Sequence, residues 1–197
     1  MTINLEKIYA GLKAWRHERG ITAESQKAGY LVNVMEELCE LATALREYER
    51  FSKPSYPYQK NKKYAEYGII DALCDISVFT INAGADVNCN EKIEIINTSQ
   101  TTRCNSSLSF LLSECGNFVY YGKFSSYVCF NQILLSCAKL CEQYGFDFQI
   151  AMDETIKEIS SRTGAYDENA KKWVKDESNE AKAKWYQADY EKARIKQ

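Results

Sequence analysis

The sequence GIIDALCDISVFTINA, residues 68–83, decides the fold because as a helix it has almost no face for water. At about 100° per residue, its apolar side chains cover nearly the whole circumference of an α-helix. A helix that is apolar almost all round is a buried helix. Asp71, Asp75 and Asn82 nevertheless fall within about 40° of one another on the helical wheel. The stretch therefore predicts a buried helix that carries one narrow polar stripe.

The two carboxylates of this stripe need a partner. Burying an unpaired carboxylate costs several kcal/mol, so a basic side chain or a metal ion must neutralise Asp71 and Asp75. Neither the stripe nor its flanks contains Lys or Arg. Oxygen ligands of this kind suit a hard divalent cation, Mg²⁺ or alternatively Mn²⁺.

The preceding helix offers matching carboxylates. Glu37 and Glu40 are three residues apart and Glu36 and Glu40 are four apart, which places these side chains on one face. Asn33 lies on the same side, one turn earlier. If the two helices pair antiparallel, several carboxylates converge in the core of the bundle. A lone ExxE is usually a solvated helix face, so the predicted metal site depends on both stripes together.

The rest of the chain fits a helical protein. Only two prolines and nine glycines interrupt its 197 residues, which favours long helices over many short strands. Apolar periodicity predicts helices at residues 4–19, 22–50, 64–85, 108–121, 127–144, 147–161 and 179–196, with a strand as the alternative at 118–121. A linker at 51–63 and a loop at 86–106 separate them. In the second helix the expected core stripe is Leu31, Val34, Met35, Leu38, Leu41, Ala42 and Leu45. The predicted fold is one all-α domain over residues 1–197, a bundle of long antiparallel helices completed by dimerisation.

Composition excludes several classes of protein. The net charge of −2 provides no basic field for polymeric DNA or RNA. The N-terminus has no apolar segment typical of a signal peptide, and no stretch reaches the length of a transmembrane helix. The eight cysteines contain no CxxC pair and several lie in apolar helical runs, which indicates reduced core thiols. We therefore expect a cytoplasmic protein that binds neither membrane nor polymeric nucleic acid.

The two acidic stripes together resemble a known family. Glu36-Glu37-x-x-Glu40, followed by Asp71 and Asp75 on the next long helix, resembles the all-α NTP pyrophosphatase superfamily. That group includes MazG-like proteins, dimeric dUTPases and phosphoribosyl-ATP pyrophosphatases. Its pattern is EExxE and then ExxD, in which Asp75 matches the Asp. Ala72 stands at the place of the family Glu, and Asp71 lies one residue earlier. The resemblance covers about residues 22–86, and relative to short members residues 88–124 form an insertion.

The resemblance implies an activity and assigns roles. It implies Mg²⁺-dependent hydrolysis of a nucleoside triphosphate, a dNTP, to the monophosphate and pyrophosphate. Its metal ligands are Glu37, Glu40, Asp71 and Asp75, and its catalytic residues are Glu36, Glu37 and Glu40. Either Glu36 or a ligand carboxylate orients or deprotonates the attacking water. The expected substrate contacts are Asn33, Asn82, Lys60, Lys63, Arg162 and Lys171. Members of the family are dimers or tetramers, so a homo-oligomer is expected.

Three alternatives stay open. The first is hydrolysis of phosphoribosyl-ATP alone. The second is a non-catalytic bundle that binds a nucleotide or a protein, which Ala72 at the place of the family Glu would suit. The third, a carboxylate-bridged di-iron protein, ranks last, because such sites need Glu-x-x-His ligands and neither acidic helix contains histidine. Tyr56, Tyr58 and Trp173 could stack on a base, although packing is the simpler interpretation.

Overall fold

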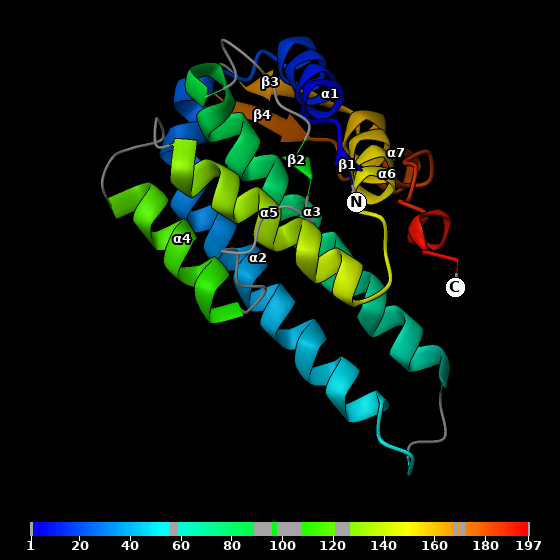
Figure 1. Cartoon of the computed structure of the whole chain (residues 1–197). Helices are drawn as coiled ribbons and strands as arrows, with labels where there is room; N and C mark the ends of the chain where they lie inside the picture. The colour runs from blue at the N-terminus through cyan, green and yellow to red at the C-terminus, as the bar shows by residue number, and fades with distance from the viewer. Residues whose placement is uncertain are drawn as a thin grey trace.

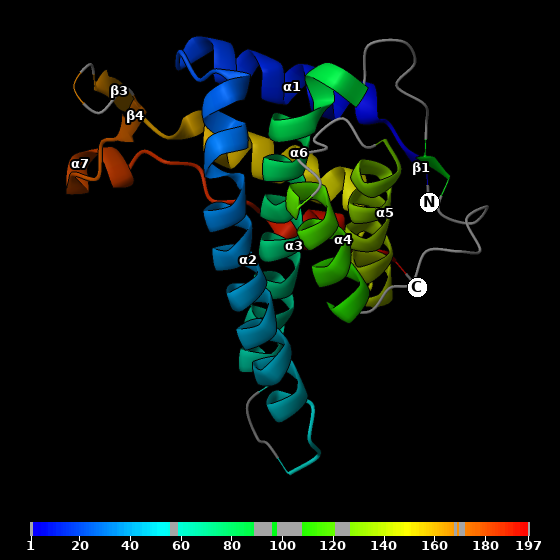
Figure 2. The same cartoon turned by 90° about the vertical axis from the view of Figure 1, so that its left-hand side faces the viewer.

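Two long helices, α2 (Ala23–Phe51) and α3 (Gln59–Asn88), run antiparallel along each other and form the centre of the computed structural model (Figures 1 and 2). The structure describes residues 2–55, 59–88, 96–97, 108–120, 127–167, 169 and 172–196. Helices α4 (Leu108–Tyr120) and α5 (Tyr127–Gln143) pack on one side of this pair, and α1 (Leu5–Glu18) and α6 (Phe148–Ser161) pack near one end. The predicted all-α fold is confirmed.

The start of α2 is as predicted and the start of α3 is not. Thr22 caps α2, since its side chain accepts a 3.2 Å hydrogen bond from the backbone N–H of Ser25. The predicted start of the next helix at residue 64 is wrong, because α3 begins at Gln59. The Lys60 ammonium lies 5.6 Å from the ring centroid of Tyr64, one turn ahead, a contact that favours continuing the helix through the basic cluster.

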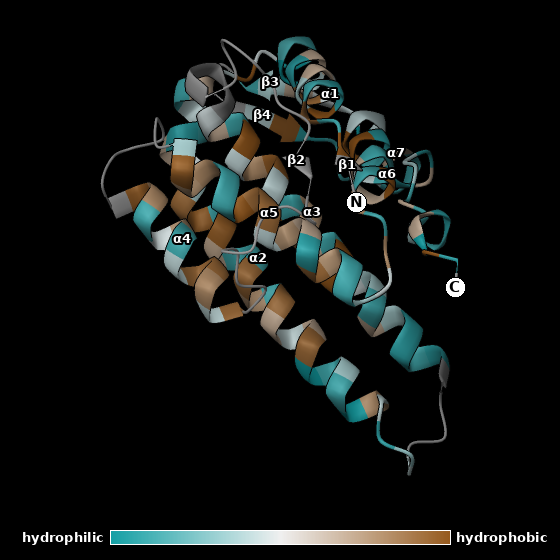
Figure 3. Ribbon diagram, viewed as in Figure 1, coloured by the Kyte–Doolittle hydropathy of each residue, from teal (hydrophilic) through white to brown (hydrophobic). Residues whose placement is uncertain are grey.

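The core confirms that α3 is a buried helix. Ile69, Leu73 and Ile76 are 0% exposed, and apolar residues gather where the helices meet (Figure 3). The predicted core stripe of α2 is wrong at two positions, because Leu31 is 52% exposed and Met35 is 48% exposed. Helices α3 and α4 cover the face of α2 that carries Val34, Leu38 and Leu41, which leaves those two side chains toward solvent.

The C-terminal region differs most from the prediction. The helix expected at 179–196 is wrong, since the segment contains only α7 (Asn179–Lys182) and a 3₁₀ helix, η2 (Tyr190–Ala193). Before it, β3 (Gly164–Asp167) and β4 (Lys172–Lys175) form an antiparallel hairpin. Backbone N–H groups of the last segment bond to α6 instead of to a helix of their own: Ala188 N–H donates to Glu158 at 2.8 Å, and Asp189 N–H donates to Glu154 at 3.2 Å.

The middle of the chain contains three of the predicted helices. The helices predicted at 108–121, 127–144 and 147–161 are confirmed as α4, α5 and α6, so the strand alternative fails at Phe118, which lies within α4. Most of the predicted loop at 86–106 lies outside the described residues, apart from the end of α3 and β2 (Ile96–Asn97), which pairs with β1 (Thr2–Ile3).

The described cysteines are free thiols, and Cys39 is exposed. Within the described ranges no helix is long and apolar enough to cross a membrane.

Candidate active site

A pocket of about 530 Å³ lies where α1, α2, α3, the end of α6 and the β3–β4 hairpin meet. Its size is ordinary for a small-molecule site. Its polar and charged lining comes mainly from α2 and from the segments near the hairpin. The lining side chains that matter for chemistry are Trp15, Thr22, Ser25, Gln26, Asn33, Glu36, Glu37, Asp75, Arg162, Tyr166, Trp173 and Lys175.

One wall of the pocket carries carboxylates from both long helices. Glu36 and Glu37 come from α2, and Asp75 comes from the polar stripe of α3. Burial raises the pKa of Glu37 to about 7, and the nearby charges of Glu40, Asp71 and Glu36 add to this rise, while Arg162 opposes it. Burial, followed by the charges of Asp71 and Glu37, raises the pKa of Asp75 well above its usual value. Carboxylates of α2 and α3 therefore lie near one another at this wall, but the predicted convergence of four metal ligands is not found among the described residues.

Asp71 lies in this cluster but outside the pocket lining. The hydroxyl of Tyr190, in η2, donates a 2.6 Å hydrogen bond to Asp71 Oδ1. Burial raises the pKa of Asp71, and the hydrogen bond from Tyr190 acts in the opposite direction. Ala72, at the place where the resembling family has Glu, is 1% exposed and belongs to the core. Glu40 is exposed and also outside the lining, although its charge contributes to the raised pKa of Glu37.

Of the predicted cationic contacts, the structure places one at the pocket and two away from it. Arg162 lines the pocket and forms a 2.7 Å ion pair with Glu158, one turn back on α6. Lys175, in β4, also lines the pocket and was not predicted. Lys60 and Lys63 do not line it, and the Lys63 ammonium lies 3.2 Å from Glu191.

Of the remaining predicted contacts, Asn33 lines the pocket on the same helix as Glu36 and Glu37. Asn82 does not line it and is 1% exposed. Neither the oxygen nor the nitrogen of the Asn82 side-chain amide has a hydrogen-bond partner within the described parts of the chain. Lys171 lies outside the described residues.

The donor chemistry of the site fits Mg²⁺. Within the described ranges, no three Asp, Glu, His or Cys side chains lie close enough together to hold a metal ion. Mg²⁺ commonly binds through one or two carboxylates, substrate phosphates and several retained waters, so a closed protein cage is not required. Glu37 and Asp75 would supply the carboxylates. Burial is the main cause of their raised pKa values, and a cation would offset the second cause, the negative charge of the neighbouring carboxylates.

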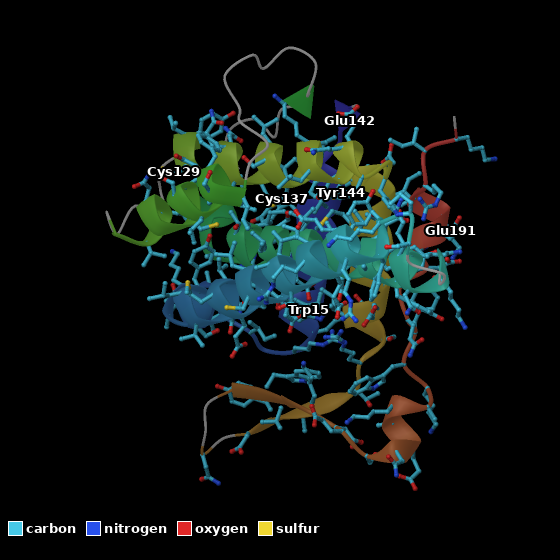
Figure 4. The ribbon with its side chains drawn as sticks, turned by 90° about the horizontal axis from the view of Figure 1, so that it is seen from below. Trp15, Cys129, Cys137, Glu142, Tyr144 and Glu191 are labelled. Atoms are coloured by element: carbon cyan, nitrogen blue, oxygen red, sulfur yellow. The ribbon has the colours of Figure 1, made fainter. Side chains whose placement is uncertain are left out.

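The hairpin was missed by the sequence-based prediction. It contributes Tyr166, Trp173 and Lys175 to the pocket. The available signal was the aromatic and β-branched pair Trp173-Val174 between two lysines, together with Gly164 at the start of the partner strand. Figure 4 shows Trp15 on the side of the helical body that faces this hairpin.

Comparison of the chain with protein-family models, with curated proteins and with solved structures gave no match in any of the three. The function is therefore inferred from the residues of the pocket and their surroundings.

Proposed function

We propose that this protein is an Mg²⁺-dependent nucleoside triphosphate pyrophosphohydrolase that acts on a dNTP. One observation carries the proposal: a pocket of about 530 Å³ brings Glu36, Glu37 and Asp75 from the two long helices together with Arg162 and Lys175. Carboxylates for a hard cation and cationic side chains for phosphate oxygens are the groups that this reaction needs.

The roles of the residues follow from their places. Glu37 and Asp75 would hold Mg²⁺, with Asp71 and Glu40 next to them in the same negative field. When bound, Mg²⁺ would polarise the phosphates and offset the charge of the leaving pyrophosphate. Arg162 and Lys175 would bind phosphate oxygens.

Glu36 would act as the general base, since it lines the pocket beside the metal-binding carboxylates. It would take a proton from water as the water oxygen bonds to the α-phosphorus. The bond from that phosphorus to the bridging oxygen breaks, and the products are the monophosphate and pyrophosphate.

We also propose that the protein is at least a dimer in solution, localised to the cytoplasm. Leu31, Val32 and Met35 on α2 are 52%, 62% and 48% exposed, and Leu112 on α4 is 50% exposed. Leu31, Met35 and Leu112 border one small cavity between α2 and α4, and exposed apolar side chains that lie together favour coverage by another protein surface. Light scattering on the wild type and on Met35→Glu tests this part, with a smaller particle expected for the variant. A monomeric wild type would contradict it.

The catalytic proposal is tested by measuring pyrophosphate release from a panel of ordinary and modified dNTPs and NTPs, with phosphoribosyl-ATP included. Release that requires Mg²⁺ and prefers dNTPs supports the proposal. Release from phosphoribosyl-ATP alone would favour that alternative. Mg²⁺ or nucleotide binding without release from any compound would leave the non-catalytic binding bundle.

A further inference from the structure

The pocket has a second wall of different chemistry, which the β3–β4 hairpin provides. Tyr166 and Trp173 are directly opposite each other in the antiparallel register, and both line the pocket. Opposite residues of paired strands project to the same face of a sheet. The next pair, Ala165 and Val174, projects to the other face, and neither residue is part of the pocket lining. The hairpin therefore directs its two aromatic rings to one side, toward the pocket.

Trp15 of α1 adds a third aromatic ring to this wall. The hairpin is fastened to the helical body beside it by Arg19, whose guanidinium carbon lies 5.6 Å from the ring centroid of Trp15 and 5.2 Å from that of Trp173. The same guanidinium donates hydrogen bonds to the carbonyl oxygen of Ser160 at 2.8 Å and to that of Arg162 at 3.0 Å. The aromatic wall is therefore held in place next to Arg162, which also lines the pocket.

Gly164 allows Trp173 to take this position. A Cβ atom at residue 164 would lie 2.5 Å from Cζ2 of the Trp173 ring, closer than real Cβ atoms approach. The indole ring thus packs directly over the backbone of β3. Gln26 of α2 also lines the pocket, and its amide group provides hydrogen-bond donors and an acceptor beside the aromatic rings.

We propose that Trp15, Tyr166 and Trp173 form the binding site for the base of a nucleotide, whose phosphates lie toward Glu37 and Asp75. The placement of the phosphates beside Glu37 and Asp75 rests on the proposed function. Aromatic side chains bind any nucleobase by stacking, and a hydrogen-bonding amide beside them can select among bases. The ligand class is accordingly a nucleotide with a planar base, whereas inorganic polyphosphate lacks the part that this wall recognises.

The experiment measures the binding of four α,β-methylene dNTPs and of inorganic tripolyphosphate, each with Mg²⁺, by isothermal titration calorimetry. The variants are Trp173→Leu, Trp173→Phe and Val174→Leu, which is the matched control on the opposite face of the same strand. Circular dichroism and melting curves establish that each variant is folded. We expect Trp173→Leu to weaken the best-bound dNTP analogue roughly 10-fold to 100-fold. Trp173→Phe, which keeps a ring, and Val174→Leu should bind nearly as the wild type does.

Inorganic tripolyphosphate has phosphates but no base, so its binding tests the phosphate end of the pocket alone. Its affinity should be the same in the wild type and in Trp173→Leu. Equal weakening of tripolyphosphate and nucleotide in Trp173→Leu would overturn the proposed base site, and so would nucleotide binding that the variant leaves unchanged. Trp173-dependent nucleotide binding without pyrophosphate release would support the base site while the proposed reaction fails. Pyrophosphate release with an unchanged KM in Trp173→Leu would support the reaction and overturn the base site.

Discussion

The hydroxyl of Tyr190 donates a 2.6 Å hydrogen bond to Asp71 Oδ1 and so joins the C-terminal segment to the acidic stripe of α3. Tyr190 is 5% exposed and also shares a 3.0 Å hydrogen bond with the hydroxyl of Thr155 in α6. Residues 119 positions apart in the chain thus meet at the side of the proposed metal site. The C-terminal segment, which sequence patterns predict to be an ordinary charged helix, holds one of the carboxylates in place.

Replacing Tyr190 by Phe should therefore affect both stability and activity. The change leaves a buried carboxylate without one hydrogen bond, which costs about 1–3 kcal/mol of unfolding free energy. We expect the Mg²⁺ concentration for half-maximal pyrophosphate release to change as well. The control is Tyr186→Phe, which removes a hydroxyl bonded to Glu154, a carboxylate outside the pocket lining. Both variants should lose stability, and an altered Mg²⁺ requirement in Tyr186→Phe alone would contradict this role of Tyr190.

The raised pKa of Glu37 predicts how stability depends on pH without divalent cations. The pKa is about 7 in the folded protein and 4.5 for the ordinary group, so between these values the folded state binds more protons than the unfolded state. The free energy of unfolding should therefore fall as pH rises through this window and level off above it. The full shift corresponds to about 3 kcal/mol. Because Glu37 is only partly buried, solvent screening reduces the expected loss for this residue alone to the order of 2 kcal/mol.

Urea denaturation in EDTA at pH 5 and pH 8 measures this loss. Glu37→Gln should reduce the difference between the two pH values, because the amide does not titrate. Glu47→Gln, at an exposed position of the same helix, should keep the wild-type difference. An unchanged pH dependence in Glu37→Gln would show that the carboxylates of α2 and α3 do not interact as described.

The lowered pKa of Glu154 predicts that stability is lost as pH falls, the opposite of the pH dependence expected from Glu37. Its side chain is 2% exposed. Burial alone would raise its pKa, but hydrogen bonds from Lys157, Tyr186 and the Asp189 backbone, among others, lower it to about 2. The stability that Glu154 contributes is thus present above about pH 4.5 and is lost as pH falls toward 2. Glu154→Gln should lower the unfolding free energy at pH 7 by about 2 kcal/mol. It should also flatten the acid limb of a melting-temperature profile, and an acid limb equal to that of the wild type would contradict this account.

Gly164 and Gly116 differ in the space available to an added Cβ atom, so alanine substitutions at the two positions can be compared. Gly164→Ala should destabilise the protein by about 1–3 kcal/mol. Its new Cβ would meet the carbonyl oxygen of Val174 and the ring of Trp173. Gly116, within α4, has nothing within 4 Å of an added Cβ, so Gly116→Ala should stabilise by about 0.5–1 kcal/mol. Thermal melts distinguish the two, and equal effects of the same sign would show that the hairpin does not pack as described.

Helical periodicity was sufficient to predict the helices whose apolar faces pack in the core. The apolar circumference of residues 68–83 and the Thr22 cap are local features, and both reappear in α3 and α2. The facing of Glu37 and Asp75 was also predictable, because spacing on each helix determines which side chains share a side. Leu31 and Met35 were misjudged, because periodicity defines an apolar face but not how much of it one chain covers.

The C-terminal region was not predictable from local patterns. Residues 179–196 have a helical composition, yet their backbone groups find partners in Glu154 and Glu158 of α6. These contacts join residues at least 30 positions apart, and no helical period encodes them. The same holds for Lys63, whose nearness to the acidic helix in sequence suggested a phosphate contact but whose ammonium pairs with Glu191.

We propose that carboxylates of α2 and α3 support cleavage between the α- and β-phosphates of a nucleoside triphosphate. The most direct measurement is identification of the products that the wild type, Asp75→Asn and Glu47→Gln form from one dNTP with Mg²⁺. We predict monophosphate and pyrophosphate in equal amounts from the wild type and from Glu47→Gln, and at least a 100-fold loss in rate for Asp75→Asn, on the order of a lost transition-state contact. Diphosphate and phosphate as products, or full activity in Asp75→Asn, would contradict the claim.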